Sequence, residues 1–212
     1  MRLGCLGCLT TLILATVLLG GVWSAVQIVR APEAPLIVAH SPADGVRAQQ
    51  KIFDLLRRAE AGRAHTTTLS EQEVNAFLRR HVPEEDLPLR DLGVRLPGDG
   101  QAEITGRIAL RQLLAVPPLS ALVSVLPERV REHGVWMTVL ARVTLETTDA
   151  SRERRRVRLD VTRFRLGRLP LPEAALRLLM DPAALRWLRW PAPRAIDGIR
   201  IDAGHVTLEH RS

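Results

Sequence analysis

The first thirty residues constrain the fold of this chain more than any other stretch. No charged residue occurs between Leu3 and Val29, and about 20 apolar residues suffice to cross the hydrocarbon core of a bilayer as a helix. A cleaved signal peptide would have a shorter apolar core and a small residue near the cleavage point, where this sequence has Trp23. We therefore expect residues 1–30 to be an uncleaved transmembrane anchor, and a cleaved signal peptide is the alternative.

The residues that border this run fit the edges of a membrane. Arg2 precedes it and Arg30 follows it, and Trp23 falls where an amphipathic indole ring would lie at the membrane–water interface. Arg2 and the amino terminus favour a cytoplasmic N-terminus, whereas Arg30 favours the opposite orientation. We expect a single-pass membrane protein with a cytoplasmic N-terminus and a C-terminal domain outside the cytoplasm.

The rest of the chain has the composition of one folded domain. Hydrophobic residues make up 46% of the sequence, which supports a packed core and argues against general disorder. Residues 31–40 contain two prolines and are expected to form a linker, and residues 41–212 are long enough for one domain. The net charge of +7 suits an anionic surface but identifies no particular one.

Two serines begin predicted helices. A proline and an aspartate follow Ser41 and suit a first helical turn, and Ser70 forms a capping box with Glu73. The first helix is predicted to end near Gly62 and the second before Pro83. Apolar residues recur near helical spacing in the first helix at Val46, Ile52, Phe53, Leu56 and Ala59.

After the second helix the hydrophobic period changes from that of a helix to that of a strand. Residues 92–96 and 104–110 alternate apolar and polar side chains on either side of the turn sequence PGDG. The register that puts both apolar sets on one face also places Arg95 opposite Glu103. The sequence therefore predicts an antiparallel hairpin.

A second, longer hairpin is predicted further along the chain. Its first strand, 135–148, is much longer than the usual five or six residues, and an arginine-rich return strand follows it. The register that aligns the apolar residues also places Arg142 opposite Asp160 and Glu146 opposite Arg156. Hydrophobic pattern and charge therefore favour the same register.

Continued without interruption, this register predicts an apolar patch on the outer face, at the end away from the turn. It places Trp136 beside Leu166, Thr138 beside Phe164 and Leu140 beside Thr162. Because long strands twist strongly, we expect the sheet to curl around a helix at 42–60 or 173–189. The expected cover of the patch is the helix at 173–189, with Trp187 and Trp190, or else an acyl chain.

Six arginines of the return strand have no obvious partner in this register, namely Arg154, Arg155, Arg158, Arg163, Arg165 and Arg168. A solvated edge explains them, and a patch for the phosphate groups of lipids or envelope polymers is the alternative. Apolar residues alternate between these arginines, as in a strand, and few aromatic residues are available to stack on bases. We therefore expect no nucleic-acid partner.

No sequence motif assigns a reaction to this chain. The sequence contains no nucleophile elbow, phosphate-binding loop or dinucleotide fingerprint. One dense cluster of histidine and carboxylates, at 81–86, follows a helix end and contains a proline, which indicates a solvated loop. Cys5 and Cys8 have the C-x-x-C spacing of redox and metal motifs, but they lie in the apolar run and are expected to act as small apolar residues. We expect a non-catalytic protein without a metal or a cofactor.

The order of these elements resembles that of a group of uncharacterised bacterial single-pass membrane-anchored proteins. The resemblance rests on the N-terminal anchor, on TLSEQEVNAFL (68–78), on GRLPLP (167–172) and on a terminal strand pair around the sequence DAG. That group is in turn similar to tubular lipid-binding domains. The resemblance implies a long, curved antiparallel sheet that wraps a helix and leaves an apolar groove, and it carries no catalytic residues.

We therefore expect an α+β domain with a long, curved antiparallel sheet of hairpins packed on helices. Its expected function is to bind lipid or another amphiphile in the cell envelope, with a structural subunit of a membrane complex and an envelope enzyme without a recognisable motif as alternatives. The residues expected to contact lipid or an anion are Trp136, Leu140, Phe164, Leu166, Arg163, Arg165, Arg168, Trp187 and Trp190.

Overall fold

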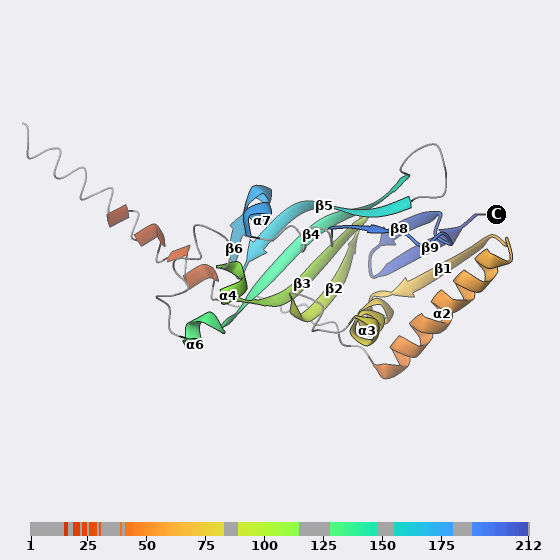
Figure 1. The fold of residues 1–212 in the computed structure, drawn as a ribbon, viewed down its shortest axis with the longest axis horizontal. Helices are drawn as coiled ribbons and strands as arrows, with labels where there is room; N and C mark the ends of the chain where they lie inside the picture. Colours follow the sequence, from red (N-terminus) through yellow and green to blue (C-terminus); the bar gives the residue numbers. More distant parts are fainter. Residues whose placement is uncertain are drawn as a thin grey trace, which may run out of the picture.

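The computed structural model describes most of the chain after residue 40. It describes residues 41–82, 89–114, 128–147, 155–179 and 188–211, with residues 15–16, 19–21, 23–24, 26–28, 30 and 39 of the N-terminal region. Within these residues the chain is α+β, as predicted, and its strands form two antiparallel sheets. Figure 1 shows the smaller sheet beside one end of the larger one.

The larger sheet is built from six strands, which are β2 (Arg90–Gly98), β3 (Gln101–Ala109), β4 (Gly134–Thr147), β5 (Arg155–Leu166), β6 (Leu169–Leu171) and β7 (Arg189–Pro191). The first five lie side by side in chain order, and β7 pairs with β5. The smaller sheet has β9 (His205–His210) between β1 (His65–Ser70) and β8 (Gly198–Asp202). The helices are α2 (Pro42–Glu60), α3 (Glu71–His81), α4 (Leu110–Leu113), α6 (Glu128–Arg131) and α7 (Glu173–Leu179).

Both predicted helix starts are confirmed. At the start of α2 the Ser41 hydroxyl accepts the backbone N–H of Asp44 at 3.3 Å, and the Asp44 carboxylate accepts the N–H of Ser41 at 2.7 Å. Ser70 and Glu73 make the same reciprocal pair at the start of α3. Each pair satisfies backbone N–H groups that a helix start leaves without an intrahelical acceptor.

Helix α2 lies against α3 and β1, not under the larger sheet. Gly45 lies against α3, where a Cβ would make an ordinary contact with Ala76, 3.5 Å from its carbonyl oxygen. The Lys51 ammonium then reaches the Glu73 carboxylate at 2.8 Å. The expectation that the larger sheet curls around this helix is therefore wrong.

Helix α3 covers the edge of the larger sheet at β2. The side-chain amide of Asn75 accepts the N–H of Val94 at 2.7 Å and donates to the Val94 carbonyl oxygen at 2.6 Å. The Glu71 carboxylate accepts the N–H of Leu96 at 2.7 Å. Because an exposed strand edge is a template for pairing with another chain, these hydrogen bonds protect β2.

The predicted register of both hairpins is confirmed in part. In the first hairpin Arg95 lies opposite Glu103, and the register shifts on both sides of this centre. In the β4–β5 hairpin the predicted register holds from the turn to the pair of Ala141 and Val161. Beyond that pair the register shifts by one residue, because Thr162 is an extra residue in β5 and forms a β-bulge.

The bulge reverses the faces that were predicted for the rest of β5. Phe164 lies opposite Val139 and Leu166 lies opposite Met137, and the Phe164 and Leu166 side chains are buried in the core, at 1% and 3% exposure. Burial of a large apolar side chain contributes about 1.5–3 kcal/mol, so two such residues favour the shifted register. The predicted outer-face pairs are wrong, namely Trp136 with Leu166, Thr138 with Phe164 and Leu140 with Thr162.

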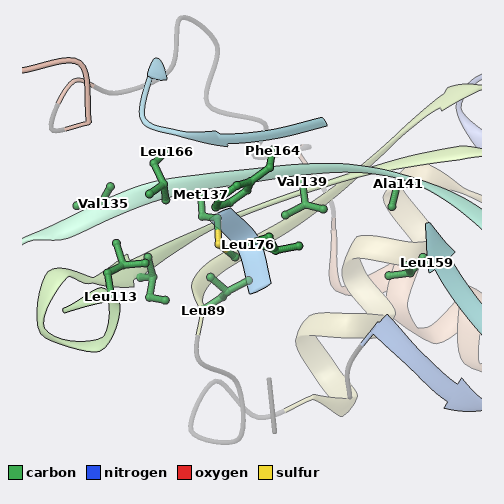
Figure 2. Packing of buried hydrophobic residues seen from close by; sticks show 11 residues of the cluster. Leu89, Leu113, Val135, Met137, Val139, Ala141, Leu159, Phe164, Leu166 and Leu176 are labelled. Atoms are coloured by element: carbon green, nitrogen blue, oxygen red, sulfur yellow. The ribbon is translucent and has the colours of Figure 1, made fainter. Parts of the chain in front are cut away.

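The main apolar cluster lies on one face of the larger sheet. It is built from alternate residues of β4 and from β5, and helix α7 contributes Leu176. Figure 2 shows Met137, Phe164 and Leu176 gathered near the centre of this cluster. A second, smaller cluster joins β2 and β3 to β8, and Ile104 and Val143 pack against both clusters. The two sheets therefore share one continuous apolar interior.

The predicted transmembrane anchor at 1–30 falls largely outside the described residues. The described parts of 15–28 are helical. Among the residues that the structure describes, no helix combines the length and the apolar character needed to cross a membrane. The anchor stays a prediction, and so does the linker at 31–40, of which Ala39 alone is described.

Candidate functional site

The β4–β5 hairpin has two ends with different chemistry. We call the end formed by Trp136, Leu166 and Gly167 the open end, and the end formed by Glu146 and Arg155 the turn end. We call the described residues between 15 and 30 the N-terminal segment. In Figure 1 this segment lies beside the open end, and α2 lies at the opposite end of the molecule. The candidate site is at the open end.

Backbone contacts hold the N-terminal segment against the open end. The N–H of Arg168 donates to the carbonyl oxygen of Gln27 at 2.9 Å. The neighbouring N–H of Gly167 donates to the carbonyl oxygen of Trp136 in β4 at 2.7 Å. Gly167 has a φ of 56°, and a Cβ at this position would overlap the carbonyl oxygens of Gln27 and Ile28. Glycine is therefore required both for the left-handed backbone and for the close approach.

The apolar interior continues into the N-terminal segment. Ile28 is partly buried and packs against the main apolar cluster, in which Met137, Phe164 and Leu166 are exposed by 3% or less. Three large apolar side chains earlier in the segment are exposed, namely Leu19, Trp23 and Val26. Apolar side chains therefore lead from the exposed part of the segment to the interior of the domain.

The outer face of the larger sheet, opposite the main cluster, combines an aromatic ring with arginines at the open end. The Arg107 guanidinium lies over the Trp136 ring, 5.5 Å from its centroid. Arg163 and Arg165 project from this face because Phe164 between them points into the core. Neither guanidinium has a hydrogen bond or an ion pair with another described residue. A phosphate group can approach them without displacing a carboxylate of the described residues.

At the turn end, in contrast, Arg158 is held between two carboxylates. Its Nη1 lies 2.6 Å from Glu146 Oε1 and its Nε lies 2.5 Å from Asp160 Oδ1. These carboxylates raise the pKa of Arg158, first through the hydrogen bond that Arg158 donates to Glu146 and then through the charge of Asp160. The prediction that Arg158 lacks a partner is wrong, and within the described residues Arg142 and Arg156 form no ion pair with these carboxylates.

Arg155 joins the turn end to the smaller sheet through Asp197. Its guanidinium bonds the Asp197 carboxylate, which also accepts the backbone N–H of Arg211 at 2.5 Å. Burial alone would raise the pKa of Asp197, but the Arg211 N–H and then the Arg155 guanidinium outweigh it, so the pKa lies below its usual value. His210 Nδ1 lies 2.9 Å from the same carboxylate, although it is not aligned for a hydrogen bond. The prediction that Arg155 lacks a partner is therefore also wrong.

The structure divides the predicted site residues between the two faces of the sheet. Phe164 and Leu166 are core residues, whereas Trp136, Leu140, Arg163 and Arg165 lie on the outer face and Arg168 follows the β5–β6 turn at Gly167. Trp23 is 64% exposed in the N-terminal segment, and Arg30 follows it. Trp187, Arg2 and Arg154 lie outside the described residues.

The predicted helix at 173–189 is confirmed at α7 and is wrong at Arg189, which begins β7, while residues 180–187 lie outside the described residues. Trp190 belongs to β7, where it pairs with Val157 and is 40% exposed. The contact of α7 with the main cluster is made by Leu176, which is 1% exposed. The expectation that Trp190 covers the outer-face patch is wrong, because a residue paired with the buried Val157 lies on the core face of the sheet.

Sequence reasoning missed two residues that build the open end. In the sequence Gly167 stands at the start of GRLPLP, and a glycine at the end of a long strand signals a turn with a positive φ. Ile28 carries no signal in the sequence, because one more apolar residue in an apolar run does not reveal a tertiary contact.

The described residues of the open end present apolar side chains and arginines. Within the described ranges, no group of three or more His, Cys, Asp or Glu side chains is placed to hold a metal ion. The cluster predicted at 81–86 is described only at His81 and Val82, and His81 Nδ1 lies 3.0 Å from the Phe77 carbonyl oxygen.

No known family model, curated protein or solved structure matches the chain. The resemblance to membrane-anchored relatives of tubular lipid-binding domains therefore stays an expectation.

Proposed function

We propose that this protein is a single-pass membrane protein of the cell envelope that binds a lipid or another amphiphile. Residues 1–30 anchor it, and the domain at 41–212 lies outside the cytoplasm. The observation that carries the proposal is the packing of Ile28 against the main apolar cluster. It joins the segment expected in the bilayer to the interior of the domain.

The contact gives an acyl chain an apolar route out of the bilayer. A chain that follows the N-terminal segment meets Ile28 and then the cluster that contains Phe164 and Leu166. Each methylene that leaves water contributes about 0.8 kcal/mol, so even a partly buried chain would bind measurably.

The charges at the open end suit an anionic headgroup. Arg163 and Arg165 have no carboxylate partner among the described residues, whereas Arg155 and Arg158 at the turn end do. A phosphate at the open end therefore adds charge-assisted hydrogen bonds and breaks no ion pair between described residues. The backbone contacts of Gly167 and Arg168 with the N-terminal segment would keep this end at the membrane surface.

Native mass spectrometry of the full chain, extracted from membranes in mild detergent, tests lipid binding. We expect a phospholipid to co-purify with the wild-type chain. The double variant Arg163→Glu with Arg165→Glu should retain at least several-fold less of it. Arg156→Glu is the matched control, because Arg156 is an exposed arginine of the same strand at the turn end. Absence of lipid from the folded wild-type chain would contradict the proposal.

A reporter fused after Ser212 tests the location. We expect a reporter that is active only outside the cytoplasm to be active in this fusion, because Arg2 and the amino terminus favour a cytoplasmic N-terminus. Activity of a cytoplasm-specific reporter at the same site would overturn both the topology and the proposed function.

A further inference from the structure

Helix α2 carries an apolar stripe on the side that faces solvent. Phe53 is 63% exposed, Val46 43% and Leu56 36%. Outside the N-terminal segment, Trp190 is the other large hydrophobic side chain exposed to this degree among the described residues. A single helix face therefore holds three of the four, which differs from the scattered single exposures that are normal on a protein surface.

The packing of α2 fixes this face outward. On the opposite side Ala48 and Leu55 are buried, at 0% and 1% exposure. The salt bridge from Lys51 to Glu73 holds the same side. The helix cannot rotate to bury Phe53 without breaking these contacts.

The stripe has the length and the charge of a small helix-packing surface. Val46 and Phe53 are seven residues apart and Leu56 follows three residues later, so the three side chains share a face about 15 Å long. Asp54 and Arg57 lie at its rim, 4.0 Å apart. The face is therefore largely apolar, with the exposed Gln49 between Val46 and Phe53, and carries both signs of charge at its edge.

We propose that this face docks a second copy of the chain, with α2 packed antiparallel against α2. A two-fold axis between residues 50 and 53 would bring the two Phe53 rings together and would place Val46 of each copy near Leu56 of the other. One stripe is then complementary to itself, as a two-fold interface requires. A surface for anionic lipid would instead carry an excess of cations around the apolar residues, and this rim does not.

This inference rests on the membrane anchor of the proposed function, which allows two copies to pair through a short interface. Confinement of both copies to one membrane raises their effective concentration, so weak contacts are enough to hold them together. In Figure 1 α2 lies at the outer edge of the molecule, away from the N-terminal segment. Pairing through α2 therefore leaves the open end accessible to lipid.

Cysteine cross-linking of the full chain in native membranes tests the proposal. Cys5 and Cys8 are first replaced with serine, which leaves no other cysteine in the sequence. Gln50→Cys lies near the proposed axis, and we expect mild oxidation to link most of it into disulfide dimers. Arg58→Cys is the matched control, because it is also exposed but lies about 140° around the helix from Phe53. Its dimer yield should be at least fivefold lower.

A substitution on the stripe completes the test. Phe53→Asp in the Gln50→Cys chain should lower the dimer yield at least fivefold, whereas Arg58→Asp should leave it unchanged. Because Phe53 is exposed, its replacement should not change the thermal midpoint, which is measured alongside. Equal yields at positions 50 and 58, or a yield that Phe53→Asp does not change, would overturn the proposal.

A vesicle assay separates this proposal from a lipid surface and from the proposed function. The assay measures whether the full chain, embedded in nanodiscs, captures phosphatidylglycerol vesicles. The face is a lipid surface, and our proposal fails, if the chain captures the vesicles, Phe53→Asp abolishes this capture and Gln50→Cys does not cross-link. Cross-linking does not depend on lipid at the open end, so a chain that dimerises without co-purified lipid contradicts only the proposed function.

Discussion

The two ends of the β4–β5 hairpin use the same arginine-rich strand in different ways. At the turn end Arg155 and Arg158 are paired with carboxylates, and the register follows the simple alternation of the sequence. At the open end a bulge at Thr162 shifts the register, and Arg163 and Arg165 have no carboxylate partner among the described residues. The arginine content of a strand therefore does not define its role, because the role depends on which face each arginine occupies and on what lies beside it.

The largest expected effect is at the open end, in the core. Phe164 is 1% exposed in the main apolar cluster, so Phe164→Ala should lower the free energy of unfolding by about 3–5 kcal/mol. The control Arg163→Ala, one residue earlier on the outer face, should change it by less than about 0.5 kcal/mol. Denaturant titration measures both, and equal effects of the two substitutions would mean that the bulge does not turn Phe164 inward.

The next effect is at the turn end. Asp197→Asn removes the charge that pairs with Arg155 and weakens acceptance of the Arg211 N–H, and we expect a loss of about 1–3 kcal/mol in the free energy of unfolding. The pKa of Asp197 is lowered in the folded chain, so its stabilisation is present above the unfolded value of about 3.9 and disappears as the pH falls through the folded pKa. The difference between wild type and Asp197→Asn should therefore shrink below about pH 4, and a constant difference would contradict this account.

A smaller effect is expected when the residue that separates the two registers is removed. Deletion of Thr162 closes the bulge but leaves Val161 opposite Ala141 and Arg163 opposite Leu140. We therefore expect a folded protein whose loss of stability is smaller than that of Phe164→Ala, although a whole residue is missing. Circular dichroism and thermal unfolding measure this, and an unfolded deletion variant would show that the register at the open end depends on the bulge itself.

The smallest effect concerns the choice of charge partner at the turn end. A double-mutant cycle between Glu146 and Arg158 should give a small favourable coupling that weakens with salt, because the ion pair is partly exposed. The cycle between Arg142 and Asp160, which are opposite in register but not paired, should give no coupling. A larger coupling for the second pair would reverse the assignment of partners.

The sequence predicts the elements of this fold better than it predicts their packing. Capping residues and alternating patterns are local signals, so the helix starts at Ser41 and Ser70 and the register near the turn of the long hairpin are confirmed. The bulge at Thr162 is not local, because it depends on the core that Phe164 and Leu166 fill. For a similar reason the sequence does not reveal which face of α2 is exposed. The buried face includes small residues such as Gly45 and Ala48, so the large apolar residues of the helix do not mark it.

The candidate site shows the same limit. Among the described residues Arg163 and Arg165 have no carboxylate partner, whereas Arg155 and Arg158 do, and those partners become visible only when side chains are placed in space. The contact between Gly167 and the N-terminal segment joins parts of the chain that are far apart in sequence. Neither part alone indicates it.

The central claim is that lipid binds at the open end of the hairpin, and photo-cross-linking tests it most directly. The full chain is reconstituted in vesicles that contain a phospholipid with a diazirine in its acyl chain, illuminated, and mapped by peptide mass spectrometry. We predict adducts on residues 134–140 and 161–171, besides those on the N-terminal segment, and at least several-fold fewer on residues 142–147 and 155–160. Adducts confined to the N-terminal segment, or spread evenly along both strands, would contradict the claim.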